Sequence, residues 1–209
     1  MSEWKLSAED VPDFSTVPFF QGHPWVPPEA QAGHRERTAM VAALAGEVVL
    51  EYSLSSISDI GCGDGSLLGK LKGIVPEGFR MWGYDAGSEN ISIARLQGLD
   101  VRQADILSSP LEYGDLITCC EVVEHLAHPH DFIKMLPHDR MLVLSSPSAE
   151  TDEWHYVHHA WAWDMEGYAK MVEGAGWKVI LHRECEGSSA NHCGINGPQR
   201  FQAIFAVKP

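Results

Sequence analysis

The sequence predicts an α/β fold in which strands and helices alternate and most strands run parallel. Three observations support this prediction. Short apolar runs alternate with helical stretches along most of the 209 residues. A glycine-rich turn, 61–65, follows the first of these runs and leads into a helical stretch. The last two apolar runs, 177–184 and 200–208, have only a turn-rich segment between them, which indicates an antiparallel hairpin at one edge of the sheet.

The order of the elements follows from proline content and hydrophobic patterning. Residues 1–30 hold five prolines among several aromatic side chains, so we expect an irregular arm that packs on the domain or covers it as a lid. The domain itself is expected over 31–209, because a domain usually has about 100–200 residues. The segment 28–51 favours a helix, with a possible break at Gly46. Strands are expected at 55–60, 80–85, 99–106, 114–120, 140–147, 177–184 and 200–208, and further helices at 66–75, 89–98, 130–137 and 165–176.

Composition and charge exclude several classes of protein. Hydrophobic residues make up 44% and charged residues 21%, the balance of a globular chain rather than a disordered or fibrous one. Fifteen Lys and Arg against 29 Asp and Glu leave a net charge of −14, which disfavours long nucleic acids and anionic membranes as partners. The first residues do not form a secretory signal, and no run reaches the roughly 18 apolar residues of a membrane span. Five cysteines without CxxC spacing are expected to be free thiols of a cytoplasmic protein.

The turn 61–65 has the properties of a nucleotide-binding loop. It reads Gly-Cys-Gly-Asp-Gly; its glycines let the backbone approach a ligand, and the helix after it offers unpaired N–H groups. The next strand ends at Asp85, where a carboxylate can bind both hydroxyls of a ribose. Glycine turns also form for steric reasons, and Asp85 by itself could be a strand-end turn or a helix cap. The two features together favour a ligand site.

The spacing of the glycines separates two cofactors. The dinucleotide fingerprint, Gly-x-Gly-x-x-Gly, would need a glycine where Ser66 stands. With Asp59 the loop reads Asp-Ile-Gly-Cys-Gly-Asp-Gly-Ser, which resembles the cofactor loop of class I S-adenosylmethionine-dependent methyltransferases. The resemblance covers about 55–208 and implies a Rossmann-like sheet of seven strands in the order 3-2-1-4-5-7-6. It also implies that S-adenosylmethionine is bound by Asp59, Gly61, Cys62, Gly63, Asp85, Ala86, Asp105, Ile106 and Glu121.

Acidic and imidazole side chains follow the fourth and fifth expected strands. Glu121, Glu124 and His125 have the spacing i, i+3 and i+4, which places them on one face of a helical turn. His159 lies in a second histidine-rich segment. Both segments follow strand ends, where open α/β sheets bind ligands. Two carboxylates and two imidazoles suit a divalent metal such as Mn²⁺, Mg²⁺, Fe²⁺ or Zn²⁺, although His125 and His159 could instead act as a base, position the acceptor, or be structural.

Two methyltransferase families share parts of this cluster. The Glu-x-x-Glu-His string and the later His159 are similar to the metal-binding motif of the small-RNA 3′-terminal 2′-O-methyltransferases. His158 and Ala162 depart from that motif, which has Asp and Glu there, and the chain has no basic stretch that would bind RNA. The same string resembles the ubiquinone-pathway O-methyltransferases, in which it need not bind a metal. We therefore expect methyl transfer to a small-molecule or sugar hydroxyl, with metal-dependent 2′-O-methylation of an RNA 3′ end as the alternative.

Classes outside the methyltransferases remain open from the sequence. A non-catalytic cofactor-binding protein or an NAD-dependent oxidoreductase would also keep a glycine turn, although Glu121 and His125 disfavour the former. We expect catalysis to depend on His125, His159 and Glu121, and we expect no DNA or membrane partner. Trp161 and Trp163 either line an acceptor pocket or pack on the sheet. Exposed turns are expected for the other histidines near this cluster, which are His128, His130 and His138.

Overall fold

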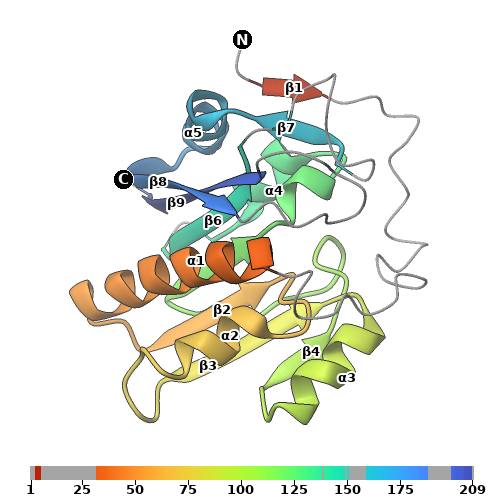
Figure 1. The fold of residues 1–209 in the computed structure, drawn as a ribbon, viewed down its shortest axis with the longest axis vertical. Coiled ribbons are helices and arrows are strands. Elements are labelled where there is room, and N and C mark those ends of the chain that lie inside the picture. The colour runs from red at the N-terminus through yellow and green to blue at the C-terminus, as the bar shows by residue number, and fades with distance from the viewer. Residues whose placement is uncertain are drawn as a thin grey trace.

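The computed structural model describes residues 3–5, 32–137, 139–148, 150, 159–187 and 199–208. Its main body is a seven-stranded sheet in the order β4-β3-β2-β5-β6-β9-β8 (Figure 1). Counted along the chain within this sheet, the order is 3-2-1-4-5-7-6, which confirms the expected topology. The strands are β2 (Ser56–Ile60), β3 (Arg80–Asp85), β4 (Val101–Gln103), β5 (Leu116–Cys120), β6 (Met141–Pro147), β8 (Lys178–Gly187) and β9 (Gln199–Val207).

The directions of the strands explain where a ligand can bind. Strands β4, β3, β2, β5 and β6 run parallel to one another, whereas β9 is antiparallel to both β6 and β8, as the expected C-terminal hairpin requires. The parallel strands therefore end at one common edge. β2 and β5 are adjacent in the sheet, and the strand order reverses between them. The end of such a pair of strands is the usual ligand site of an open α/β sheet.

Helices cover both faces of the sheet (Figure 1). On one face, α1 (Ala32–Glu51) and α2 (Ser66–Leu71) bury apolar side chains such as Leu44 and Leu71 against Ile57 and Val143. On the other, α4 (Pro129–Met135) and α5 (Met165–Gly174) bury a second cluster against the sheet. The helix α3 (Ser88–Leu96) packs on β4 at the sheet edge. Within the described residues, no helix is both long and apolar enough to cross a bilayer.

The helix α1 differs from the expectation at Gly46, where it continues without a break. A methyl group on Gly46 would come within 2.3 Å of Ile74 Cγ2, so the glycine lets α1 approach the segment after α2 closely. Glycine lowers helix stability by about 1 kcal/mol relative to alanine. The close packing of α1 against the sheet explains why the helix persists there.

A second, two-stranded sheet was not expected. The short strand β1 (Glu3–Lys5) runs antiparallel to β7 (Trp161–Trp163), with Glu3 opposite Trp163. The expectation of a wholly irregular arm over 1–30 is therefore wrong at these three residues, because β7 offers an unpaired edge to which a strand can add. The rest of that arm lies outside the described residues.

Candidate active site

The glycine turn connects the end of β2 to α2 with a left-handed backbone at Gly61 and Gly63, whose φ angles are 75° and 53°. A methyl group on Gly61 would lie 2.3 Å from Val122 Cγ2, so this glycine is required by the packing of the loop itself. Among the described residues, a methyl group on Gly63 would have no neighbour within 4 Å. Gly63 therefore borders open space, which is where a ligand can approach the loop.

Asp85, at the end of β3, is anchored by backbone N–H groups on both of its oxygens. Its Oδ2 accepts a hydrogen bond from Gly63 N at 2.9 Å, and its Oδ1 accepts one from Gly87 N at 2.8 Å. Burial nevertheless raises the pKa of Asp85 above its usual range, against the lowering effect of these bonds. The carboxylate is thus fixed beside the open side of the turn, a geometry that fits the pair of ribose hydroxyls of S-adenosylmethionine.

Asp59 is fully buried in β2 and contacts the neighbouring strand β5. Its Oδ1 accepts a hydrogen bond from Thr118 Oγ1 at 2.7 Å. Burial raises the pKa of Asp59 to about 7, and the negative charge of Asp85 adds to the effect. The described contacts therefore give Asp59 a role in joining β2 to β5.

The other expected cofactor residues lie in the glycine turn and after the ends of β3 and β4. Cys62 is buried against Gly83, and burial raises the pKa of its thiol. Its backbone holds the turn together, because its N–H donates to the Tyr84 carbonyl at 2.9 Å and its carbonyl accepts from Gly65 N at 3.0 Å. Asp105 uses its carboxylate within its own turn, where Oδ1 accepts from Leu107 N at 2.9 Å. Ile106 packs against the core, and the Ala86 carbonyl accepts from Gln103 Nε2 at 3.0 Å.

Glu121 does not share a helical face with Glu124 and His125, so that expectation is wrong. It follows β5 with a left-handed φ of 55°, and the short 3₁₀ turn η3 (Val123–His125) begins two residues later. Its carboxylate turns back toward the sheet: Oε1 accepts from Ser145 Oγ at 2.8 Å, and Oε2 lies 3.2 Å from Arg37 Nη1 of α1. Burial raises the pKa of Glu121, while Arg37 and Ser145 lower it.

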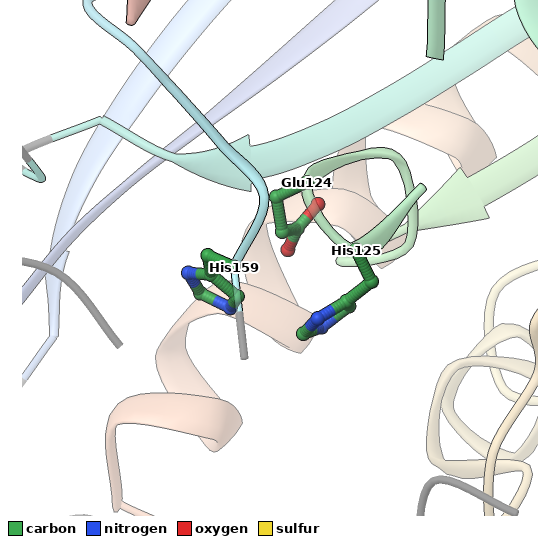
Figure 2. Close-up of side chains that lie close together, drawn as sticks. All are labelled: Glu124, His125 and His159. Atoms are coloured by element: carbon green, nitrogen blue, oxygen red, sulfur yellow. The ribbon is translucent and has the colours of Figure 1, made fainter. Parts of the chain in front are cut away.

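Glu124, His125 and His159 form the acid and imidazole cluster of the site (Figure 2). One possible ligand atom of each lies within 4.8 Å of those of the other two, and Glu121 lies outside this group. The rings of His125 and His159 meet edge to face, with centroids 4.6 Å apart. The η3 turn carries Glu124 and His125, and its Glu124 carbonyl accepts a hydrogen bond from Ala160 N at 2.7 Å, which fastens the His159 segment to the turn.

The carboxylate of Glu124 is the most unusual group of the cluster. Both of its oxygens are buried without a hydrogen-bond partner among the described residues. Burial raises its pKa well above the usual range, and the charge of Glu121 adds to this. A buried carboxylate without a partner is costly unless a cation or a proton compensates it. The carboxylate of Glu124 and the imidazoles of His125 and His159 together form a donor set that suits Mn²⁺, Fe²⁺ or Zn²⁺.

The tryptophans and the other histidines near the cluster differ in how far they match the expectations from the sequence. Trp163 is fully buried in the core and packs near Tyr168 rather than lining an acceptor pocket, with ring centroids 5.6 Å apart. Trp161 is half-buried and meets the ring of His130 at 5.1 Å, so His130 is not simply a solvated surface residue. His128 is exposed, as expected. His138 and His158 lie outside the described residues.

Two residues of the site were missed from the sequence. Arg37 lies on α1, whose sequence shows no site pattern, and Glu150 binds His159, with Oε2 2.5 Å from Nδ1. Glu150 shares no motif with the other acidic residues; its only signal is its position shortly after the end of β6.

Comparison with known proteins agrees with this fold. Residues 35–183 match the family model described as a methyltransferase domain, which covers more than half of the chain. The chain therefore belongs to the methyltransferase domain family. This family confirms the methyltransferase class expected from the glycine turn.

Curated relatives match part of the chain. The ubiquinone biosynthesis O-methyltransferase of Yersinia enterocolitica is 28% identical over 111 residues, which cover 47% of this chain and 45% of that protein. The protein of the same name from Marinobacter nauticus is 33% identical over 87 residues, which cover 36% of this chain and 35% of that protein. The match thus spans less than half the length of these relatives.

Solved structures share the fold at low sequence identity. The magnesium protoporphyrin IX methyltransferase of Synechocystis PCC 6803, with bound S-adenosylhomocysteine, has a TM-score of 0.64 at 16% identity, and the match covers 90% of each chain. The methyltransferase domain of bacterial CtHen1-C has a TM-score of 0.56 at 19% identity over 85% of this chain and 100% of that one.

Proposed function

We propose that the protein transfers the methyl group of S-adenosylmethionine to a hydroxyl oxygen of a small molecule. The observation that carries the proposal is the cluster of Glu124, His125 and His159, which follows β5 and β6 at the edge of the sheet that holds the glycine turn. An imidazole within reach of an acceptor hydroxyl can take its proton as the oxygen attacks the methyl group. The names of the curated relatives, O-methyltransferases of ubiquinone biosynthesis, support oxygen as the acceptor atom.

In this proposal the cofactor lies along the glycine turn. Asp85 binds the ribose hydroxyls, and the backbone of Gly61, Cys62 and Gly63 borders the methionine end. Ala86, Asp105 and Ile106 lie along the adenosine side. The excess of carboxylates around the site favours a cationic sulfonium ligand over an anionic one.

The acceptor side depends on the cluster and on Glu121. His125 and His159 are the proposed bases, because neutral imidazole accepts a proton near neutral pH. Glu121, held by Arg37 and Ser145, is proposed to border both the cofactor and the acceptor. Alignment of oxygen, methyl carbon and sulfur is the main requirement of such a displacement, so residues that hold the acceptor in place contribute to rate as much as the base does.

The same cluster fits a divalent cation, and we propose that Glu124, His125 and His159 would hold it. The carboxylate of Glu124, which is buried and has no hydrogen-bond partner among the described residues, is the observation that supports this. A bound metal would increase the acidity of an acceptor hydroxyl. Glu121 is a less suitable ligand than the sequence suggested, because its two oxygens are bound to Ser145 and Arg37.

Methyl transfer from labelled S-adenosylmethionine tests the proposal, with catechols, other phenols, sugars and short RNAs with a free 3′ end as acceptors. A labelled phenol ether or sugar ether formed by the wild type would support the proposal, provided that His125→Ala and His159→Gln no longer form it. A matched control is His128→Gln, which changes an exposed histidine that follows η3 in the sequence. Label on nitrogen or carbon would overturn it, and label on RNA alone would favour the RNA-end alternative, against which the net charge of −14 weighs.

A further inference from the structure

Glu150 contacts the imidazole of His159 through a short hydrogen bond inside the protein. Its Oε2 lies 2.5 Å from His159 Nδ1, and the exposed fractions of the Glu150 and His159 side chains are only 8% and 9%. An ionised carboxylate only accepts hydrogen bonds, so Nδ1 carries the hydrogen of this contact. In neutral imidazole the lone pair then belongs to Nε2.

We infer that Glu150 is a positioning residue, which fixes the ring orientation of His159 and keeps Nε2 as its reactive nitrogen. The inference rests on the proposed function of His159, but the contact it describes can be measured separately. Carboxylates that accept from the other nitrogen of a metal-binding or basic histidine orient the ring and raise its basicity. Glu150 would do both for the cluster with Glu124 and His125.

The backbone supports the same arrangement. Ala160 N donates to the Glu124 carbonyl at 2.7 Å, so the main chain next to His159 is already joined to the η3 turn. This bond fixes where the side chain starts. The contact of Nδ1 with Glu150 and the edge-to-face contact with the His125 ring restrain rotation of the imidazole. Together these contacts explain how an imidazole outside a helix or strand keeps a defined place beside Glu124 and His125.

Histidine ¹⁵N NMR on the metal-free protein at one fixed pH tests the inference directly, with the His159 signals assigned from their loss in His159→Gln. We expect Nδ1 of His159 to be protonated in the wild type, and the hydrogen to move to Nε2 in most molecules of Glu150→Ala. Glu150→Gln, which keeps the size of the side chain, provides a second variant if the alanine variant does not fold. In it the amide carbonyl can still accept, so the Nδ1–H form is retained but its signal shifts.

Cation binding gives a second readout, with Co²⁺ alone as the probe. We expect Glu150→Gln and Glu150→Ala to weaken Co²⁺ binding by about 10- to 100-fold, the usual effect of removing a carboxylate behind a histidine ligand. Glu166→Gln, the same change at an exposed position beside Lys170, should leave it unchanged. All variants should bind S-adenosylhomocysteine like the wild type.

Two results separate the possible failures. An unprotonated Nδ1 in the wild type, or the same His159 spectrum in Glu150→Ala, would overturn the role of Glu150 whatever the reaction. If the wild type does not bind Co²⁺ but the spectra change as expected, the metal in the proposed function fails and the positioning role of Glu150 stands.

Discussion

Arg37 Nη1 of helix α1 lies 3.2 Å from Glu121 Oε2 at the end of β5, so the first helix of the domain contributes directly to the candidate active site. The guanidinium also lies over the ring of Phe201, 5.4 Å from its centroid. Through these two contacts Arg37 joins α1 to the end of β5 and to β9, elements that are far apart along the chain. It also supplies a positive charge beside a carboxylate that accepts a hydrogen bond from Ser145 as well.

Replacing Arg37 by Gln should destabilise the fold, because Glu121 would keep its burial and lose its counter-charge. The two side chains are 17% and 12% exposed, so we expect a loss of about 1–3 kcal/mol, less than for a fully buried pair. Urea unfolding measures this. Arg183→Gln is the control, since it removes an exposed pair with Glu47 that should contribute less than about 1 kcal/mol.

A double variant makes the same prediction sharper. If the pair is the cause, Arg37→Gln combined with Glu121→Gln should recover part of the lost stability. Strictly additive effects of the two substitutions would show that the residues do not interact.

Asp85→Ala should weaken binding of S-adenosylhomocysteine by at least about tenfold, because hydrogen bonds to a charged group contribute roughly 1.5–3 kcal/mol each. Calorimetry on the purified protein measures the affinity. Asp100→Ala is a suitable control, since Asp100 is exposed and its side chain pairs only weakly, with Arg102 at 3.6 Å. Equal affinities of the Asp85 variant and the wild type would remove the ribose assignment.

Two glycines of the turn should respond differently to alanine. Gly61→Ala places a methyl group 2.3 Å from Val122, so overpacking adds to backbone strain and the protein should lose about 2–4 kcal/mol of stability. Gly63→Ala has room for its methyl group, so only strain of about 1 kcal/mol is expected. Thermal unfolding compares the two stabilities.

The affinity for S-adenosylhomocysteine is the second quantity in which the two glycine variants should differ. Gly63→Ala should weaken S-adenosylhomocysteine binding despite its milder effect on folding, because its methyl group points into the space beside the turn. A Gly63→Ala protein with normal affinity would mean that the cofactor does not approach the loop at that residue.

The buried Asp59 predicts a pH dependence of stability in the ligand-free protein. Its pKa is raised from 3.8 to about 7 by burial, so the folded state binds the proton more tightly than the unfolded state. Stability associated with the protonated form is therefore fully present below pH 4 and is lost as the pH rises through 7, with a slope of at most about 1.4 kcal/mol per pH unit.

Asp59→Asn isolates this contribution, because an amide oxygen can still accept the hydrogen bond of Thr118 and does not titrate. As the pH rises from 4 to 7, the free energy of unfolding of Asp59→Asn should increase relative to that of the wild type. Parallel curves over that range would show that Asp59 is not the titrating group.

The cofactor side of the site was predictable from the sequence because its geometry is local. The turn between β2 and α2 is continuous in sequence, and Asp85 is the last residue of the adjacent strand, so spacing along the chain determines spacing in space. The strand order followed from a resemblance to a known family, and the alternating pattern of strands and helices supported it.

The acceptor side was predictable only in part. Glu124, His125 and His159 do meet, but a left-handed backbone at Glu121 directs that carboxylate away from them, and no helical periodicity can reveal such a residue. Arg37 and Glu150 reach the site from distant segments through single side chains. Contacts of this kind leave no pattern in a single sequence, because they depend on packing between elements rather than on spacing within one.

The place of β9 between β6 and β8 determines when the protein can complete its sheet during synthesis. β9 emerges from the ribosome after the other strands of this sheet, yet it is an interior strand, and β8 joins the sheet through it. A nascent chain that has already emerged as far as Gly187 thus carries ten strand residues without a pairing partner, while the glycine turn and Asp85 are already made. A truncation that removes the final nine-residue strand would cost the sheet two strands rather than one, and with them Phe201, on which Arg37 packs.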